Sequence, residues 1–353
     1  MRDFIYTAKP ARVRFGQGTL AELAGEIERL SLKHVVILST VGQRSMAADI
    51  AERLGSVCAG TFSGAVMHTP VTVTEEAMAV VAGMKADGLI SVGGGSTIGL
   101  GKAIALRTDL PQIVVPTTYA GSEMTAILGE TQDGAKVTKS SPRILPEVVL
   151  YDVELTMGLS AAVSVTSGFN AIAHAVEALY AQEANPIVRT LALDGIRALT
   201  GSLPALVAKT DDVHARTEAL YGAWLCGTCL GAVGMALHHK LCHVLGGTFD
   251  LPHAETHCAV LPHALAYNAP FAPEAILDLK RTLGNPDPAR HLFDLAGELG
   301  APRALRDLGM PYEGIDEAVS RALANPYWNP RPLEARALRL TIERAWAGDS
   351  PAS

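Results

Sequence analysis

The sequence predicts two domains, an N-terminal α/β domain over residues 1–154 and an all-helical C-terminal domain over residues 155–353. In the first half, short apolar runs alternate with amphipathic helical patterns, which is typical of a parallel sheet covered by helices on both faces. After about residue 155, strand signals nearly vanish and long helical patterns take over. The length of 353 residues is enough for two domains of ordinary size.

The first domain contains five strand-like runs, expected at residues 11–15, 35–38, 57–62, 89–92 and 113–115. Helical patterns lie between them at about 19–32, 44–54 and 75–86. Thr72 and Glu75 have the spacing of a capping box, so we expect them to open the last of these helices.

The second domain is expected to hold helices over residues 159–182, 186–208, 211–240, 254–269, 288–298, 302–308, 314–324 and 333–345. Gly246 and Gly247 predict a stop for the helix that carries His239 and His243.

Composition excludes several classes of protein. The net charge of −7 and the absence of a dense Lys/Arg block exclude a nucleic-acid partner. No apolar run is long enough to predict a membrane span. The first residues show no signal-peptide pattern, so a cytoplasmic location is expected. Cys226 and Cys229 form a Cys-x-x-Cys pair, but their apolar helical surroundings indicate buried packing residues rather than a redox or zinc site.

Three glycines, Gly93 to Gly95, follow the strand at 89–92 and precede Ser96 and Thr97. A glycine turn between a strand and a helix lets backbone N–H groups approach a pyrophosphate. The stretch matches neither the dinucleotide fingerprint nor the P-loop. Phosphate binding is the favoured interpretation, and a simple tight turn is the alternative.

A second polar stretch, residues 116–123, follows the strand at 113–115. Hydroxyl groups at the carboxyl edge of a parallel sheet suit contacts to ribose and phosphate. By itself this stretch fits an ordinary polar loop equally well.

Six of the 11 histidines fall within residues 238–263. His239 and His243 are four residues apart and share a helix face, and His253 follows in the chain. Asn170 and His174 have the same spacing on an earlier helix. The pattern indicates either a divalent metal site or a row of proton donors beside a substrate, against the alternative of histidines that only cap or line a core.

Together, these motifs resemble the iron-containing alcohol dehydrogenase family over nearly the whole chain: GGGS at 93–96, PTT at 116–118, Asn170 with His174, and the later histidines. The resemblance implies the dehydroquinate synthase-like fold, in which a Rossmann-like nucleotide-binding domain precedes a helical domain and the active site lies in the cleft between them.

The resemblance also implies cofactor and metal residues. NADH or NADPH would be bound by Gly94, Gly95, Ser96, Thr117, Thr118, Lys136 and Ser39. Ser39 ends a strand at which members strict for NAD often carry Asp, so both cofactors are expected to be accepted. A metal, if present, would be held by His174, His239 and His253, with Asn170 in place of the family's usual Asp ligand.

PTTYAGSEMT at 116–125 and NPYWNPRPL at 325–333 most resemble a branch of the family that reduces a carbon–carbon double bond and generally needs no metal. The implied reaction is the NAD(P)H-dependent reduction of maleylacetate to 3-oxoadipate in the catabolism of aromatic compounds, without a metal. Asn170 fits this branch, because an Asp ligand is missing. The alternative is a metal-dependent alcohol or aldehyde dehydrogenase. A synthase-type lyase and a silent nucleotide-binding module are less favoured.

In this reaction the catalytic residues would be His243, His253, His239 and His174, with His243 or His253 as proton donor. Asn170 and Tyr119 would contact the small dicarboxylate substrate. Its two charges require cationic partners, for which the candidates are Lys139, Arg143, Lys240 and Arg331, with Arg331 favoured. The family analogy implies a homodimer.

Overall fold

The computed structural model describes residues 4, 6–7, 12–132 and 135–352. The chain divides into an α/β unit, Ala8–Gly158, and a helical unit, Leu159–Ser353 together with Met1–Thr7. The division predicted at residue 154 falls inside the short 3₁₀-helix η6 (Val153–Thr156), which still belongs to the α/β unit.

The sheet of the α/β unit is parallel, as predicted, and it has six strands where the sequence predicted five. Their spatial order is β1 (Arg12–Gly16), β8 (Val148–Asp152), β5 (Gln112–Pro116), β4 (Gly88–Gly93), β2 (Val35–Leu38) and β3 (Cys58–Phe62). The sequence analysis did not predict β8, although its residues VVLYD are all buried.

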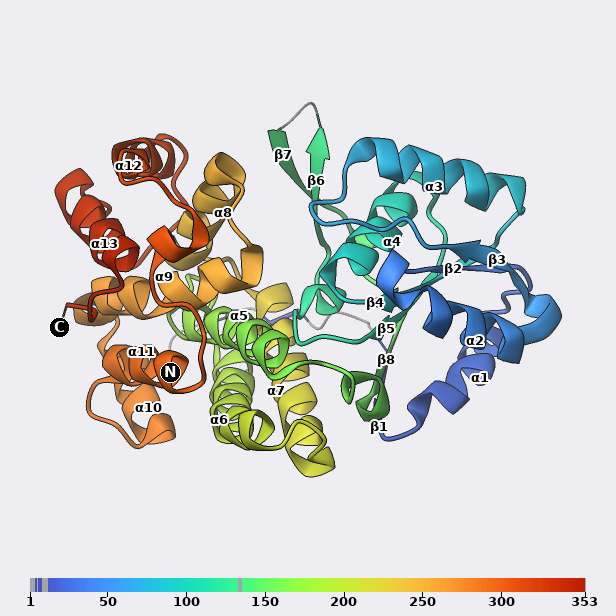
Figure 1. Ribbon diagram of the computed structural model, residues 1–353, viewed down its shortest axis with the longest axis horizontal. Helices are drawn as coiled ribbons and strands as arrows, with labels where there is room; N and C mark the ends of the chain where they lie inside the picture. The colour runs from blue at the N-terminus through green and yellow to red at the C-terminus, as the bar shows by residue number, and fades with distance from the viewer. Residues whose placement is uncertain (1–3, 5, 8–11, 133–134, 353) are drawn as a thin grey trace. The chain divides into compact units, whose positions relative to one another are not determined.

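Side chains of the strands β2 and β4 alternate between two apolar cores. Val35 and Ile37 face the core that η1 (Thr19–Glu22), α1 (Leu23–Arg29) and α2 (Arg44–Leu54) cover. Val36 and Leu38 face the core covered by α3 (Val71–Gly83) and α4 (Gly95–Thr108). Figure 1 shows these helices on the two faces of the sheet. Burial on both faces explains why the strands are continuously apolar in sequence.

Two features of this unit differ from the sequence analysis. The expected capping box is wrong, because α3 begins at Val71 and its N-cap is Pro70, whose carbonyl accepts hydrogen bonds from the Thr74 N–H and hydroxyl. The analysis also missed an antiparallel hairpin, β6 (Ile127–Gln132) with β7 (Ala135–Ser140), a pairing between segments whose sequences alternate only weakly.

The helical unit consists of α5 (Ala161–Tyr180), α6 (Pro186–Ala208), α7 (Val213–Ala232), α8 (Leu237–Phe249), α9 (His253–Asn268), α10 (Pro273–Leu283), α11 (Pro288–Glu298), α12 (Gly314–Ala324) and α13 (Ala335–Ala347). By length and composition alone α6 could cross a membrane, but 44% of its most apolar window is buried inside the structure, where it packs against α5 and α7. Cys226 and Cys229 are free thiols buried in α7, and burial raises the pKa of Cys229 to about 12.

The helix expected over 211–240 is in fact two helices, α7 and α8, bent by 94° at the break. After the break, side chains from elsewhere in the chain accept the amide N–H groups at the start of α8. The predicted stop at Gly246 and Gly247 is also wrong, since α8 continues through them to Phe249. The helix expected at 302–308 is the shorter 3₁₀-helix η8 (Leu305–Leu308), and α10 was not predicted.

Candidate active site

The glycine turn joins β4 to α4, as the sequence predicts. Gly94 is the N-cap of α4, and a Cβ at this position would lie 2.9 Å from the Thr118 side chain, so only glycine fits. The neighbouring strand β5 is paired so that Gly93 lies opposite Pro116. The turn and the PTT stretch therefore meet at one edge of the sheet, with Gly95 exposed and Ser96 half-buried at the start of the helix.

The two threonines of the PTT stretch differ in their surroundings. Thr117 is buried, and its hydroxyl accepts a hydrogen bond of 2.7 Å from Gln43 Nε2. Thr118 is half-buried beside Gly94. Thr118 is therefore the more accessible of the two hydroxyls for a bound ligand.

Two other residues expected to bind ligands in this unit, Ser39 and Tyr119, are buried. Ser39 directly follows β2; it is fully buried and its hydroxyl donates to Ser63 Oγ at 2.9 Å. Thr40, the next residue, is half-buried. Tyr119 is fully buried. Lys136 belongs to β7, and its side chain is outside the part of the chain that the structure describes.

A buried lysine of α4, Lys102, holds the loop after the PTT stretch. Its ammonium group donates to Ser122 Oγ at 3.2 Å, Thr125 Oγ1 at 2.9 Å and the Ile127 carbonyl at 3.0 Å. Burial lowers the pKa of Lys102 to about 7, and the nearby Glu123 carboxyl opposes this shift. The GLGK end of the glycine motif thus positions the loop that follows PTT.

In the helical unit, two histidines and a glutamate form a buried chain. His174 Nδ1 lies 2.7 Å from His239 Nε2, and His239 Nδ1 lies 2.7 Å from Glu177 Oε2. Their side chains come from α5 and α8 and are almost completely buried. From helix spacing, the sequence predicted that Asn170 and His174 lie near His239. In the structure, His174 and His239 are in direct contact.

Two other histidines are more accessible. His243 is half-buried on α8, and its Nδ1 lies 2.9 Å from the Tyr327 hydroxyl. Burial, and then the charge of Glu177, raise the pKa of Tyr327, so this phenol keeps its proton at neutral pH. His253 is the half-buried first residue of α9. We call His174, His239, His243 and His253, together with Glu177 and Tyr327, the histidine network.

The network has donors that suit a divalent metal. His174, His239, His253 and the Asn170 Oδ1, a buried oxygen without a hydrogen-bond partner, are neutral ligands of types that Zn²⁺ accepts. Among the described residues, the histidine, cysteine or acidic side chains whose ligand atoms all lie within 4.8 Å of one another are instead His238, Cys242 and His257. The bond from His239 Nδ1 to a carboxylate is also usual behind a metal-binding histidine.

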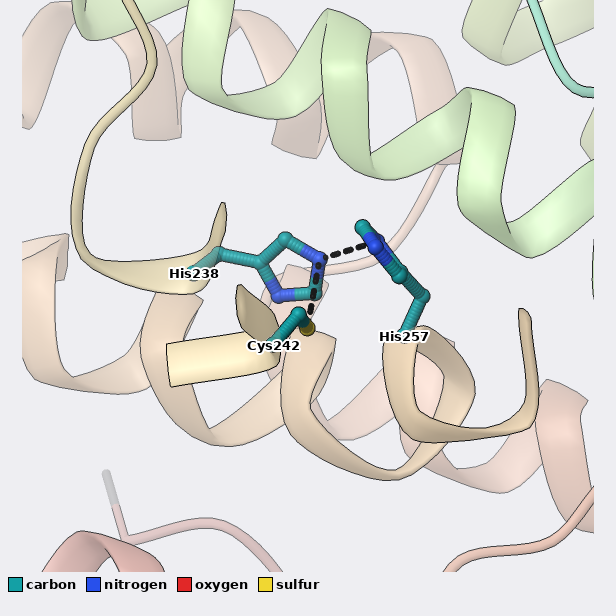
Figure 2. A group of neighbouring side chains, drawn as sticks. All are labelled: His238, Cys242 and His257. Atoms are coloured by element: carbon teal, nitrogen blue, oxygen red, sulfur yellow. Dashed lines mark hydrogen bonds between the residues drawn. The ribbon is translucent and has the colours of Figure 1, made fainter. Parts of the chain in front are cut away.

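Figure 2 shows a second histidine group, formed by His238, Cys242 and His257. It lies beside the network, since the His238 and His257 ring centres are 5.1 and 5.2 Å from that of His239. His238 Nε2 lies 2.8 Å from His257 Nδ1 and 3.7 Å from Cys242 Sγ. These side chains are buried, and burial lowers the pKa of both histidines well below its ordinary value, so they are uncharged. Their types suit a soft metal, but the outer nitrogens, His238 Nδ1 and His257 Nε2, have no partner, whereas metal-bound histidines usually donate this N–H. The geometry therefore favours a buried imidazole pair.

The four cationic candidates differ in how they are held. Arg331 stacks 4.0 Å from the Tyr267 ring centre and donates to the Tyr267 carbonyl. Lys139 pairs with Glu130 and Arg143 with Asp109. Lys240 of α8 has no carboxylate partner among the described residues and lies 5.4 Å from the Tyr327 ring centre. Burial lowers its pKa.

Comparison with known proteins decides the family. A family model described as "Iron-containing alcohol dehydrogenase" matches residues 10–153, and one described as "Fe-containing alcohol dehydrogenase family, C-terminal" matches residues 164–346. The chain belongs to the iron-containing alcohol dehydrogenase family. The fold and family predicted from the sequence are thereby confirmed.

Individual relatives agree along the whole length. The chain is 53% identical to a maleylacetate reductase of Rhizobium sp. (strain MTP-10005), covering 99% of this chain and 100% of the relative. It is 51% identical to a maleylacetate reductase of Sphingobium indicum, covering 99% of each. A crystal structure of maleylacetate reductase from Agrobacterium tumefaciens superposes with a TM-score of 0.96 at 54% identity, over 99% of this chain and 100% of that one.

Two expectations about cofactors have different outcomes. Membership of this family supports a nicotinamide cofactor. The expected absence of a metal is not supported, because the family is one of iron-containing enzymes and the network has suitable donors.

The sequence analysis assigned no role to Glu177, Tyr327 or Lys102, although a signal for each was present. Glu177 follows Asn170 by seven residues, which places the two on one face of α5. Tyr327 lies in the NPYWNPRPL stretch, and Lys102 ends the glycine motif. Nothing in their spacing indicates which distant atom each side chain contacts.

Proposed function

We propose that the protein catalyses the NAD(P)H-dependent reduction of the carbon–carbon double bond of maleylacetate to give 3-oxoadipate. The observation that carries this proposal is the similarity to maleylacetate reductases, at about half of all residues over 99% of the chain. The histidine network adds a chemical reason, because it offers accessible imidazoles from a helical scaffold.

In the proposed reaction, hydride from the nicotinamide adds to the alkene carbon β to the ketone, and negative charge develops on the ketone oxygen. A protonated imidazole that donates a hydrogen bond to this oxygen stabilises the charge. Its proton passes to the enolate, and the resulting enol takes the proton at the carbon α to the ketone, which completes the reduction. His243 and His253 are the candidates, because they are half-buried whereas His174 and His239 are buried. If the Tyr327 hydroxyl donates to His243 Nδ1, then His243 Nε2 carries the proton and can donate it.

The dicarboxylate substrate also needs a cation. We propose Lys240, which lies on the same helix as His239 and His243 and has no carboxylate partner among the described residues. Arg331 is the weaker candidate for the substrate cation, because its guanidinium already stacks on the Tyr267 ring and donates to the Tyr267 carbonyl. Asn170, with its unpartnered oxygen, and His174 are proposed to orient the substrate.

A metal bound by His174, His239 and His253 with Asn170 would act as a Lewis acid that polarises a substrate oxygen. This donor set favours a second candidate function, a metal-dependent alcohol or aldehyde dehydrogenase of the same family.

For the cofactor, we propose that both NADH and NADPH are accepted. The end of β2 presents Ser39 and Thr40, and neither carries the negative charge that would repel a 2′-phosphate. A ratio of kcat/KM for the two cofactors near unity is expected, and a ratio above about a hundred would contradict it. A homodimer in the cytoplasm also remains a proposal, which light scattering and fractionation can test.

The decisive experiment measures oxidation of NADH by the purified protein with maleylacetate, before and after exhaustive treatment with EDTA. Activity that survives chelation supports a metal-free double-bond reductase with imidazole acids. Activity that is lost on chelation and restored by Zn²⁺ or Fe²⁺ assigns Asn170 and the three histidines to a metal. Turnover of alcohols or aldehydes in place of maleylacetate would reject the proposed function and favour the second candidate.

A further inference from the structure

Glu177 is an acidic side chain of the helical unit, and the proposed reaction assigns it no role. Both of its carboxylate oxygens are hydrogen-bonded. It lies on α5, is fully buried, and contacts residues at the start of α8. Its Oε1 accepts the His238 N–H at 2.6 Å, and its Oε2 accepts the Ala236 N–H at 2.7 Å. The same Oε2 lies 2.7 Å from His239 Nδ1.

These contacts place a carboxylate at the N-terminus of α8. The first N–H groups of a helix have no partner within the helix, and a negative charge near them is stabilised by the helix dipole. Glu177 accepts from Ala236 and His238, and Asn329 Oδ1 accepts the Leu237 N–H at 3.2 Å. These two side chains therefore supply the acceptors that the first amides of α8 lack after the chain bends.

The carboxylate also determines where the protons of two histidines lie. A carboxylate only accepts hydrogen bonds, so His239 must donate from Nδ1 and present Nε2 as an acceptor. His174 then donates from Nδ1 to His239 Nε2 and carries no proton on Nε2 when it is neutral. One buried acid thereby sets the tautomers of two rings.

We propose that Glu177 is a positioning residue, which anchors the first turn of α8 and fixes the tautomers of His239 and His174. Its effect on turnover rests on the proposed function, whereas its effect on the tautomers does not. Without Glu177, a proton on His239 Nδ1 would be buried without an acceptor. The favoured arrangement would then reverse, with His239 Nε2 donating to His174 Nδ1.

The test measures the histidine tautomers by ¹⁵N NMR of protein labelled at histidine, with the His239 signals assigned from a His239→Gln variant. The native protein is expected to show His239 protonated at Nδ1 only. Glu177→Met is expected to move this proton to Nε2. Glu177→Gln, a second variant that retains more of the hydrogen bonds, is expected to show a mixture of both tautomers, because its amide must face one of the donors with its own N–H.

Asn329→Ala is the matched control. It removes an acceptor from the same helix turn, so it loosens the start of α8 but leaves His239 protonated at Nδ1. With maleylacetate, Glu177→Gln is expected to lower kcat at least tenfold while KM for NADH stays within twofold.

A native His239 protonated at Nε2, or a Glu177→Met variant with an unchanged tautomer, would overturn the proposal. If no variant or native protein reduces maleylacetate, the proposed function fails, and the tautomers still decide the role of Glu177. A normal kcat in Glu177→Gln alongside mixed tautomers would reject its effect on turnover.

Discussion

The glycine turn of the α/β unit and the histidine network of the helical unit carry chemistry in different ways. The turn depends on backbone shape, because Gly94 leaves room for Thr118 and the helix start lies next to it in the chain. The network depends on side chains from α5, α8 and residue 327 that meet only after folding. Substitutions should therefore affect the turn through steric space and the network through hydrogen bonds and protons.

The largest expected effect is on turnover in the network. His243→Ala removes the proposed proton donor and should lower kcat for maleylacetate roughly 10²–10⁴-fold, the usual range for a general acid. NADH binding, measured by fluorescence titration, should be unchanged, because that site depends on the other unit. His214→Ala, at an exposed position of α7, is the control. Unchanged turnover in His243→Ala would exclude it as the donor.

The next effect concerns acid stability of the helical unit. Burial, and then the charge of Arg344, lower the pKa of His263 from 6.5 to about 4. As pH falls through this window, the unfolded chain binds the proton first, so stability decreases with decreasing pH, by about 3 kcal/mol between pH 6.5 and 4.

Urea unfolding followed by tryptophan fluorescence measures this directly, because Trp224, Trp328 and Trp346 all belong to the helical unit. His263→Leu should lose about 3 kcal/mol less than the native protein over the same pH range. His238 and His257 remain in the variant, and burial lowers their pKa values as well. Part of the loss of stability with falling pH is therefore expected to remain. An equal dependence in both proteins would show that His263 does not contribute.

A smaller effect is expected at the glycine turn. Gly94→Val places a branched side chain against Thr118, where even a Cβ would approach to 2.9 Å. The Kd for NADH should rise at least tenfold, which is about 1.4 kcal/mol. Gly83→Ala is the control, because a Cβ there meets nothing within 4 Å. Native affinity in Gly94→Val would show that the turn tolerates a side chain and would weaken the contrast between the two regions.

The smallest effect distinguishes Arg331 from Lys240 as the cation that binds the dicarboxylate substrate. Arg331→Lys loses the stacking on Tyr267 and should lower the free energy of unfolding by about 1 kcal/mol, with little change in KM for maleylacetate. Lys240→Gln should instead raise KM severalfold. If Arg331→Lys changes KM more than Lys240→Gln does, the sequence-based preference for Arg331 as the substrate cation is restored.

The sequence by itself determined the parallel sheet, the helical second half and the glycine turn, because these depend on local periodicity and on residues adjacent in the chain. It also placed His239 and His243 on one helix, from their spacing. The contacts of Glu177, Tyr327, Asn329 and Lys102 were decided only by the tertiary structure. A buried polar side chain bonds to whichever donor or acceptor packing brings to it, and that partner lies up to 92 residues away for Asn329. The start of α8 is a further case: the local sequence favours one helix over 211–240, and the acceptors for the first amides of α8 come from Glu177 on α5 and from Asn329.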